Sequence, residues 1–555
     1  MQWRKEWQML LIRTSICMSK TTNSFFSECK TVKKKILIIV PHEDDEINVA
    51  GGILANYAYG QAEVKVVFTT NGDCFEDAYV RQREASDSLG VLGICKDNII
   101  FLGYPDQLDM RQEKWKSKKG VNRTQSTKLF DDFRYARDGY HSELSHENLV
   151  RDIQDVILDF LPDEIYCVDF DSHTDHREAS LAFEEAMGRI LNKGENYYPT
   201  VYKGFAYPTA FKGKRDFGRK GNSTKFVKEE FAACDMQNPY YVWEQRVRFP
   251  VVEKVRKPIL MQNAIYRALA KHKSQLIICQ ADRIINQDQI FWQRRTDSLL
   301  YKADICVSSG DGAYLNDYIL FDNTNMMMGN YEYPKFDKRV WIPDADDMEK
   351  SIVAKFKTEV EIQSIVFYMG CNTEAYINKI RISMDNGFVQ EFILGTDKVQ
   401  KLELGRQINV NQLQIEVLEA TGEGAGFSEL EIFGSKENSV RFIKLTEDDE
   451  FCYSTDSMNG KKIYLYNGES SASYSVDEVC EVKKERLGKK EYYFINLLDN
   501  PDIFDIVVCE KGDKDCKLKI ILICNKLSYG VTYCCYRILR KTRNIAKKMK
   551  KRGNV

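Results

Sequence analysis

Residues 34–192 alternate between two kinds of segment, and this alternation most limits how the chain can fold. Short apolar runs of strand type, beginning with KKILIIV at 34–40, are each followed by a segment with helical spacing. Strands that are apolar along their whole length are buried on both faces, so we predict an α/β domain with a mostly parallel sheet. The strands are expected at 34–40, 63–70, 98–104 and 164–170, and the helices at 50–60, 78–90, 147–160, 177–191 and 263–275.

The rest of the chain divides into further regions by its pattern of apolar and turn-forming residues. From about residue 301, short β-rich runs are separated by turn signals such as Asp385-Asn386-Gly387, which is typical of a β-sandwich. The long polar loop at 107–145 is expected to be a lid or an insertion. We predict an N-terminal extension at 1–33, a Rossmann-like α/β domain at 34–300, a β-sandwich at 301–436, a β-rich domain at 437–527 and a basic helix at 528–555.

Composition excludes several classes of protein. The 80 basic and 82 acidic residues nearly cancel, so no global basic field indicates a nucleic-acid partner. The 16 cysteines include no CxxC pair, and free thiols in a reducing compartment are the simplest interpretation. With no apolar run of 18 residues and no cleavable signal pattern, a cytoplasmic location is expected.

The C-terminal segment 536–555 is a concentrated basic stretch with two interpretations. It is either a solvated basic end or an interfacial helix that contacts the inner face of a membrane. In the second case Tyr536, Leu539, Ile545 and Met549 supply an apolar face, and the lysines and arginines meet anionic lipid.

The motif HEDDE at 42–46 places one histidine and four carboxylates where the first strand ends. Like charges this close repel and raise each other's pKa values. Either the carboxylates begin a helix, whose N-terminus favours negative charge, or a cation neutralises them. In the second case Asp45 neutralises the metal charge and Asp44 serves as a base, while Glu43 and Glu46 are spectators or helix N-terminal charges.

A second motif, HTDH at 173–176, follows the fourth strand and is expected at the same sheet edge. Three of the chain's six histidines lie in these two motifs, which favours a metal site. The alternative is helix capping by Asp171 or Asp175 beside solvated histidines. Two imidazoles and one carboxylate leave a fourth position open on zinc, which is typical of a catalytic site.

The chain resembles the PIG-L/LmbE-like N-acetylglucosaminyl de-N-acetylases. The stretch HEDDE at 42–46 is similar to the PHPDDE motif of that family. Further matching segments follow in the same order, and the similarity fades between 193 and 300, where AKHKSQ at 270–275 is reminiscent of a late family helix. The other matches are TTNGD at 69–73, RQREASDSLGV at 81–91, FLGYPD at 101–106 and HTDH.

The resemblance implies a ligand set and roles for the site. Zinc would be held by His42, Asp45 and His176, although iron could occupy the same ligands. Asp44 would be the general base, and His173 an acid or oxyanion stabiliser supported by Asp175.

Two further residues, Arg83 and Asp106, fall where the family contacts sugar hydroxyls. The alternatives are a surface helix residue for Arg83 and a turn residue for Asp106. His272 is expected on a helix face rather than in the site.

One departure from the family pattern is Glu43, which stands where the family has proline and adds negative charge beside the proposed base. The β region also resembles discoidin-like (coagulation-factor type C) modules through ISMDNG and AGFSELEIFG, which implies binding of glycans or lipid headgroups. There Glu429 is expected to anchor a loop rather than to touch a ligand.

These features together predict a zinc-dependent hydrolase that removes acetyl from an N-acetylated amino sugar of a glycan or glycolipid. Two alternatives remain at this point. One is a glycan-binding protein with a structural or inactive metal site, and the other is a zinc hydrolase of another amide or ester. The sugar, its carrier and the oligomeric state are not defined by the sequence.

Overall fold

The computed structural model describes most of residues 34–434 and the backbone of the strands between 449 and 523. The expected N-terminal extension, most of the loop at 107–145 and the basic helix at 528–555 lie outside the described residues. The residues not described are 1–33, 58–61, 74–75, 107–131, 172, 194–196, 207–238, 242–244, 250, 253–254, 256, 258, 286–288, 321, 323–338, 435–448 and 524–555, with those between the strands from 455 to 514.

The first domain is built on a seven-stranded sheet in the order β3-β2-β1-β4-β5-β7-β6. The pairs β1/β4, β2/β3 and β4/β5 are parallel, and β7 runs antiparallel to β5 and β6. This confirms the mostly parallel sheet, and its first five strands follow a doubly wound order. The strands are β1 (Lys34–Val40), β2 (Ala62–Thr70), β3 (Ile99–Tyr104), β4 (Glu164–Val168), β5 (Thr200–Gly204), β6 (Val247–Phe249) and β7 (Gln289–Arg294).

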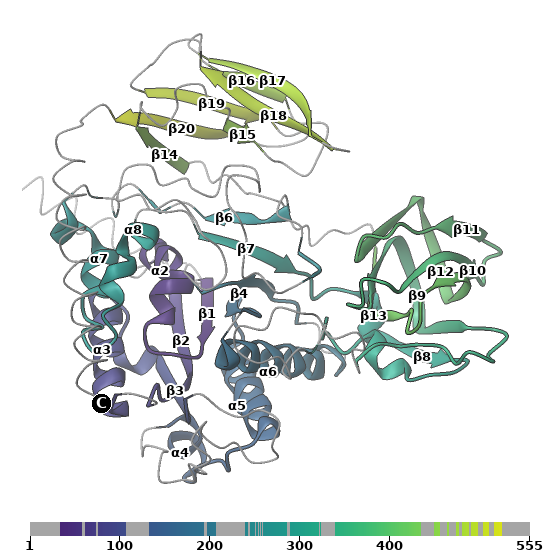
Figure 1. Cartoon of the computed structure of the whole chain (residues 1–555), viewed down its shortest axis with the longest axis horizontal. Helices are drawn as coiled ribbons and strands as arrows, with labels where there is room; N and C mark the ends of the chain where they lie inside the picture. Colours follow the sequence, from purple (N-terminus) through teal and green to yellow (C-terminus); the bar gives the residue numbers. More distant parts are fainter. Residues whose placement is uncertain are drawn as a thin grey trace, which may run out of the picture. The chain divides into compact units, whose positions relative to one another are not determined.

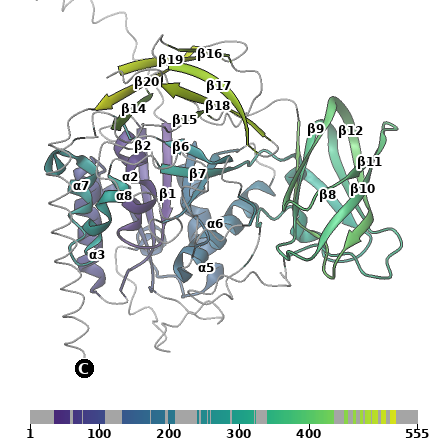
Figure 2. The ribbon, with the colours of Figure 1, turned by 45° about the horizontal axis from the view of Figure 1, so that its top comes forward.

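Helices cover both faces of this sheet (Figures 1 and 2). One face carries α2 (Asp45–Tyr57), α3 (Ala78–Val91), α7 (Ala264–Leu269) and α8 (Ala281–Ile284), and the other carries α5 (His146–Phe160) and α6 (Thr174–Leu191). Because both faces are covered, the central strand β1 is buried from Ile36 to Val40. Shorter elements are α4 (Phe133–Asp138), η1 (Lys96–Asn98), η6 (Leu260–Gln262) and η7 (Ile277–Gln280).

Two helices differ from their predicted limits. The α2 helix begins at Asp45 rather than at residue 50, because the Asp44 carbonyl already accepts the N–H groups of Ile47 and Asn48. The α7 helix ends at Leu269 rather than at 275. His272 therefore lies in the following turn, 1% exposed, and not in the helix predicted for residues 263–275.

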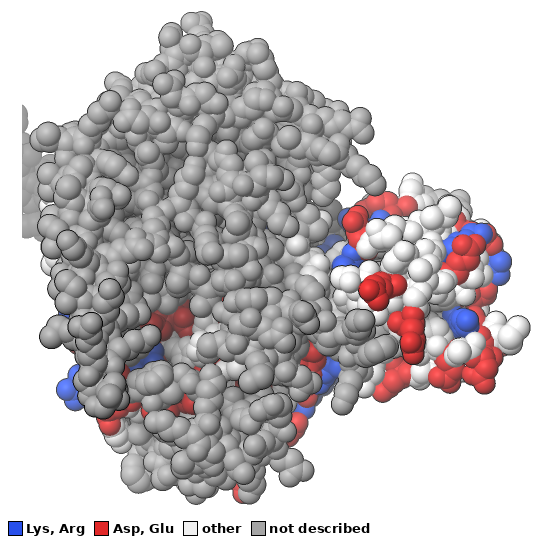
Figure 3. All heavy atoms as spheres, viewed as in Figure 1, with Lys and Arg blue, Asp and Glu red and all other residues white. Residues whose placement is uncertain are grey.

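An antiparallel β-sandwich follows, as predicted. Its sheet has the order β11-β10-β12-β9-β13, with β8 paired to β9. Bulges in the long strands β9 and β12 let the sheet bend around its apolar core. Acidic and basic side chains lie interspersed on the face of the sandwich visible in Figure 3. The elements are η8 (Leu299–Lys302), β8 (Ala303–Val307), η9 (Gly312–Leu315), β9 (Ser351–Met369), β10 (Tyr376–Met384), β11 (Val389–Ile393), β12 (Val399–Thr421) and β13 (Phe427–Phe433).

Glu429 on β13 is fully buried and holds the segment that leads into the sandwich. Its Oε1 accepts a hydrogen bond from the Tyr301 hydroxyl at 3.2 Å, and its Oε2 accepts one from the Tyr318 N–H at 3.2 Å. Both partners precede β9 in the chain. The contacts agree with the predicted anchoring role of Glu429.

Further strands lie in the region that was expected to be β-rich. They form a four-stranded sheet and a three-stranded sheet. The strands are β14 (Asp449–Ser454), β15 (Ile463–Leu465), β16 (Ser473–Val476), β17 (Cys480–Leu487), β18 (Lys490–Leu497), β19 (Ile503–Cys509) and β20 (Asp515–Ile523).

Within the described part of the chain, no helix combines the length and apolar character needed to cross a membrane.

Candidate metal centre and active site

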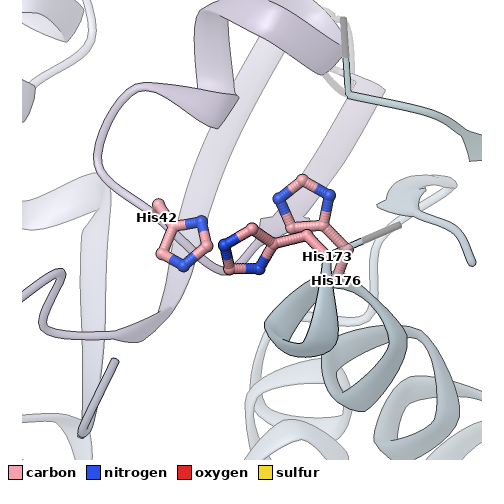
Figure 4. A group of neighbouring side chains, drawn as sticks. All are labelled: His42, His173 and His176. Atoms are coloured by element: carbon pink, nitrogen blue, oxygen red, sulfur yellow. The ribbon is translucent and has the colours of Figure 1, made fainter. Parts of the chain in front are cut away.

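Polar side chains converge where β1, β3 and β4 end. His42 follows β1, Asp106 follows β3, and His173 and His176 lie at the start of α6 after β4. Figure 4 shows the three imidazole rings turned toward one another. The His42 ring centroid lies 4.7 Å from that of His173 and 5.5 Å from that of His176. The parallel sheet therefore brings the two sequence motifs together, as its topology requires.

Backbone hydrogen bonds hold these loops in place. The Pro41 carbonyl accepts both the N–H and the hydroxyl of Thr70, at 3.0 and 2.8 Å, which ties the end of β1 to the end of β2. The Asp106 N–H donates to Asp73 Oδ1 at 3.1 Å. The His42 loop is therefore fixed by the strand beside it.

His42 is 7% exposed and contacts carboxylates through both ring nitrogens. Its Nδ1 lies 3.0 Å from Asp45 Oδ2. Its Nε2 lies 3.0 Å from Asp106 Oδ1 and 2.9 Å from Asp175 Oδ2. An imidazole held in this way has its orientation fixed by its outer partners, as is usual for metal-binding histidines.

His176 repeats the arrangement from the other motif. Its Nε2 lies 3.2 Å from Asp45 Oδ2, and its Nδ1 lies 2.6 Å from Asp171 Oδ2. The Asp45 carboxylate thus lies between two imidazoles, each of which is oriented by a further carboxylate. Asp171 was expected only as a helix cap, and the structure gives it this orienting contact.

The electrostatics of the cluster favour a cation. Burial lowers the pKa of His176, but the charges of Asp171 and Asp45 outweigh it and raise that pKa to about 10. Burial likewise opposes a high pKa at His42, yet Asp106 and the other carboxylates hold it well above its usual value. Positive charge is therefore strongly stabilised at this point, and imidazole with carboxylate is a donor set that suits a borderline divalent metal. Donor atoms of His42, His173 and His176 lie within 4.8 Å of one another, and Asp45 Oδ2 contacts both His42 and His176, so these side chains offer ligands for such an ion.

His173 differs from the other two histidines. Its side chain is 22% exposed, and its Nδ1 accepts the backbone N–H of Asp175 at 3.2 Å. Burial, together with the charges of His42 and His176, holds its pKa well below its usual value. A neutral imidazole whose Nδ1 is an acceptor carries its proton on Nε2, so His173 can donate a hydrogen bond from that atom.

Asp175, expected to support His173, contacts it through its backbone N–H and contacts His42 through its side chain. Asp175 Oδ2 lies 3.9 Å from His173 Nδ1 but only 2.9 Å from His42 Nε2. Asp175 is the second residue of the α6 helix, after the N-cap His173, and its backbone N–H rather than its carboxylate reaches His173. Asp175 therefore orients His42.

Asp44 is more accessible than its neighbour. Its side chain is 17% exposed, against 5% for Asp45. Burial and the adjacent Asp45 raise the pKa of Asp44, which increases its affinity for a proton. Asp44 thus combines access with basicity beside the two imidazoles.

Arg83 does not reach the site. It lies exposed on α3, whereas Arg81, two residues earlier, is buried and directed inward. Arg81 donates from its NH1 to the Gly72 carbonyl at 3.0 Å, and its NH2 lies 3.5 Å from Asp44 Oδ1. The buried face of α3 also includes Ala85, Ser88 and Leu89, and this helical period could have identified Arg81 from the sequence.

Glu43 is not an exposed spectator. It is fully buried, and neither of its carboxylate oxygens has a hydrogen-bond partner among the described residues. Its Oε2 lies 3.6 Å from Arg81 Nε. Gly72 has a φ of +59°, and a Cβ atom there would lie 2.3 Å from Glu43 Oε2. Glycine at this turn therefore makes room for the carboxylate.

Glu46 also has a partner that sequence reasoning missed. His272 Nε2 lies 2.7 Å from Glu46 Oε1, and the Ser88 hydroxyl donates to the same oxygen at 3.0 Å. All three side chains are buried. This contact joins residues more than 220 positions apart, so no local pattern indicates it. The motif AKHKSQ was the only feature of the sequence that pointed to His272.

Part of the chain is similar in sequence to a known family. Residues 37–187 match the family model described as PIG-L: GlcNAc-PI de-N-acetylase. A probable N-acetylglucosaminyl-phosphatidylinositol de-N-acetylase from Dictyostelium discoideum is 30% identical over 70 residues, which cover 13% of this chain and 27% of that protein. The chain thus aligns with little more than a quarter of that relative.

Two solved structures resemble parts of the chain. The N,N'-diacetylchitobiose deacetylase of Pyrococcus horikoshii is 16% identical, over 50% of this chain and 88% of its own, with a TM-score of 0.26. The family 32 carbohydrate-binding module of C. perfringens NanJ, solved with galactose, is 15% identical over 24% of this chain and 93% of its own, with a TM-score of 0.17.

The buried Glu43 should make the free energy of unfolding of the metal-free protein depend on pH. Burial raises the pKa of Glu43 to about 8, against the opposing charge of Arg81. Its contribution to stability is therefore complete below the unfolded pKa of about 4.5 and is lost as the pH rises toward 8. We expect the free energy of unfolding of wild type, relative to Glu43→Gln, to fall by about 1 kcal/mol per pH unit in this window.

Urea denaturation in the presence of a chelator at several pH values measures this difference. Glu63→Gln, at an exposed position on β2, should keep the pH dependence of wild type. Parallel pH profiles for wild type and Glu43→Gln would show that Glu43 is ionised in the folded protein.

Proposed function

Because residues 37–187 form a PIG-L family domain, we propose that this protein is a zinc-dependent de-N-acetylase of an N-acetylated amino sugar of GlcNAc type. One observation carries the proposal. A cation-stabilising cluster of His42, Asp45 and His176 lies directly beside Asp44, a carboxylate with a raised pKa and an exposed edge. A binding module with a structural metal does not require such a base.

The side chains divide the work of amide hydrolysis. Asp44 accepts a proton from the attacking water and later returns it to the leaving amine, which is the usual task of a general base. His173 donates from Nε2 to the oxygen of the scissile carbonyl as negative charge develops there. Asp106, Asp171 and Asp175 hold the imidazoles in place.

Zinc bound by His42, Asp45 and His176 would polarise the amide carbonyl and lower the pKa of a water molecule at the site. Arg81 and Asp106 line the same sheet edge and are suited to bind sugar hydroxyls through charge-assisted hydrogen bonds. The substrate is a glycan or glycolipid, and the sandwich is proposed to hold its extended part. Contact of the basic tail with a membrane remains a prediction.

Two other functions use the same residues. A glycan-binding protein with an inactive metal site would release no acetate, and a hydrolase of another amide or ester would prefer a different substrate. The accessibility and raised pKa of Asp44 favour hydrolysis over binding alone. A screen of acetylated sugars, peptides and esters separates the remaining candidates.

The metal ligands can be tested without any substrate. We expect about one zinc per chain in purified protein, because the convergent donor groups among the described residues all share His42. His176→Ala should lose most of it, since an imidazole and its Asp171-fixed orientation are both removed. Elemental analysis measures the content, and His141→Ala, a histidine paired with Asp132 instead, should retain the metal. Full zinc in a His42→Ala/His176→Ala double variant would exclude this site.

The base can be separated from the ligands by Asp44→Asn. This change keeps the shape of the side chain and removes the proton acceptor. We expect zinc to be retained and acetate release from an N-acetylglucosaminyl substrate to fall by about 10²-fold or more. Wild-type turnover by Asp44→Asn would show that another group takes the proton.

Arg81 and Arg83 provide a matched pair on one helix. Arg81→Ala should raise KM by about 10-fold or more, because a charge-assisted hydrogen bond to the sugar is lost. Arg83→Ala should leave KM unchanged, since that side chain is exposed. Steady-state kinetics on a monosaccharide measures both, and an effect of Arg83→Ala alone would restore the role expected from the sequence.

A further inference from the structure

The turn at 270–275, between α7 and η7, contacts two helices that carry site residues. From this turn His272 reaches α2, where its Nε2 lies 2.7 Å from Glu46 Oε1. Both side chains are fully or almost fully buried. A hydrogen bond to a buried carboxylate is stronger than one between neutral groups, so this contact fixes the two segments firmly.

A second contact from the same turn reaches α3. The N–H of Ser274 donates to Glu84 Oε1 at 3.0 Å and to Oε2 at 3.1 Å, and its hydroxyl donates to Oε2 at 2.7 Å. Three donor contacts from one residue to one carboxylate define the position of Glu84 closely. We call His272 and Ser274 together the brace.

The two carboxylates lie next to the groups that the proposed reaction uses. Glu46 adjoins Asp45 and is two residues from Asp44, in the first turn of α2. Glu84 lies one helical turn after Arg81, on α3. The brace therefore holds the helical turn that carries the base and the ligand, and separately the helix that carries the arginine.

The first turn of α2 needs such support. At Ala50 the backbone has φ −132° and ψ 16°, which is not helical, so residues 45–49 are set off from the rest of the helix by a kink. The helix after the kink therefore does not by itself orient the turn before it. The hydrogen bonds of Glu46 with His272 and Ser88 attach that turn to the neighbouring segments.

Apolar packing brings the brace into position. Ile265, Ala268 and Leu269 of α7 are buried. A Cβ atom on Gly51 of α2 would lie 3.4 Å from Ile265 Cγ2, so the two helices are in van der Waals contact at this point. Apolar contacts of this kind are not directional, whereas the hydrogen bonds of the brace are.

We propose that His272 and Ser274 are positioning residues that act through Glu46 on Asp44 and Asp45, and through Glu84 on Arg81. Their kinetic consequences rest on the proposed deacetylase function, but the structural coupling does not. Because the two contacts end on different functional groups, their removal should have different effects. The His272 contact should govern turnover and metal retention, and the Ser274 contact should govern substrate binding.

Kinetics tests this division. His272→Leu should lower kcat by about 10-fold or more and weaken zinc binding, whereas His272→Gln, which keeps an N–H donor, should recover much of both. Glu84→Ala, which removes all three bonds from Ser274, should instead raise KM by about 10-fold with kcat nearly unchanged. Thr296→Val is the control, because it removes one buried hydrogen bond to Pro199, at the opposite edge of the sheet.

Hydrogen–deuterium exchange tests the coupling without activity. His272→Leu should speed exchange of the Ile47 and Asn48 amides, which bond to the Asp44 carbonyl, and leave α5 unchanged. Glu84→Ala should speed exchange in α3 alone, and Thr296→Val in neither helix. Unchanged exchange in α2 and α3, or an equal increase throughout the domain, overturns the proposal. A wild-type protein that binds no zinc and releases no acetate defeats the proposed function, while the exchange result still decides the brace.

Discussion

This structure depends on the neutralisation of buried carboxylates by two imidazoles. The carboxylates lie side by side where the parallel strands end. Asp45, Asp106, Asp171 and Asp175 surround two imidazoles and are almost fully buried. Unpaired charges cannot remain in such surroundings without a large cost in free energy. The sheet order, the loops and the kink in α2 all place these groups within contact distance of His42 and His176.

Much of this arrangement could be predicted from the sequence because it follows from local patterns. Fully apolar strands separated by helical segments indicated a parallel sheet covered on both faces, and the structure has one. Because parallel strands end at a common edge, the HEDDE and HTDH motifs were expected to meet, and His42, Asp45 and His176 lie together. The roles given to these residues in catalysis and metal binding remain predictions.

Other features were not predicted, because they depend on helix orientation, on the first residue of a helix or on contacts distant in the sequence. Arg81 and Arg83 are separated by a rotation of about 200° around one helix, which position in a motif does not resolve, although the helical period shared with Ala85, Ser88 and Leu89 does. The partner of Asp175 depends on where the α6 helix begins, since one residue decides whether its backbone or its carboxylate reaches His173. The contact between His272 and Glu46 joins residues from opposite ends of the domain, and no local propensity indicates it.

The turn at Gly72 couples three positions that are far apart in the sequence. A side chain at residue 72 would collide with the Glu43 carboxylate and with Arg81 Nε, which lies 2.6 Å from the Cβ position. Residue 72 must therefore remain a glycine as long as Glu43 and an inward Arg81 lie against this turn. In related sequences with proline at the position of Glu43, a residue other than glycine should occur at the position of Gly72 only if the backbone there no longer has a positive φ. Covariation of residues 43 and 81 with residue 72 among related sequences would then reflect this steric restriction.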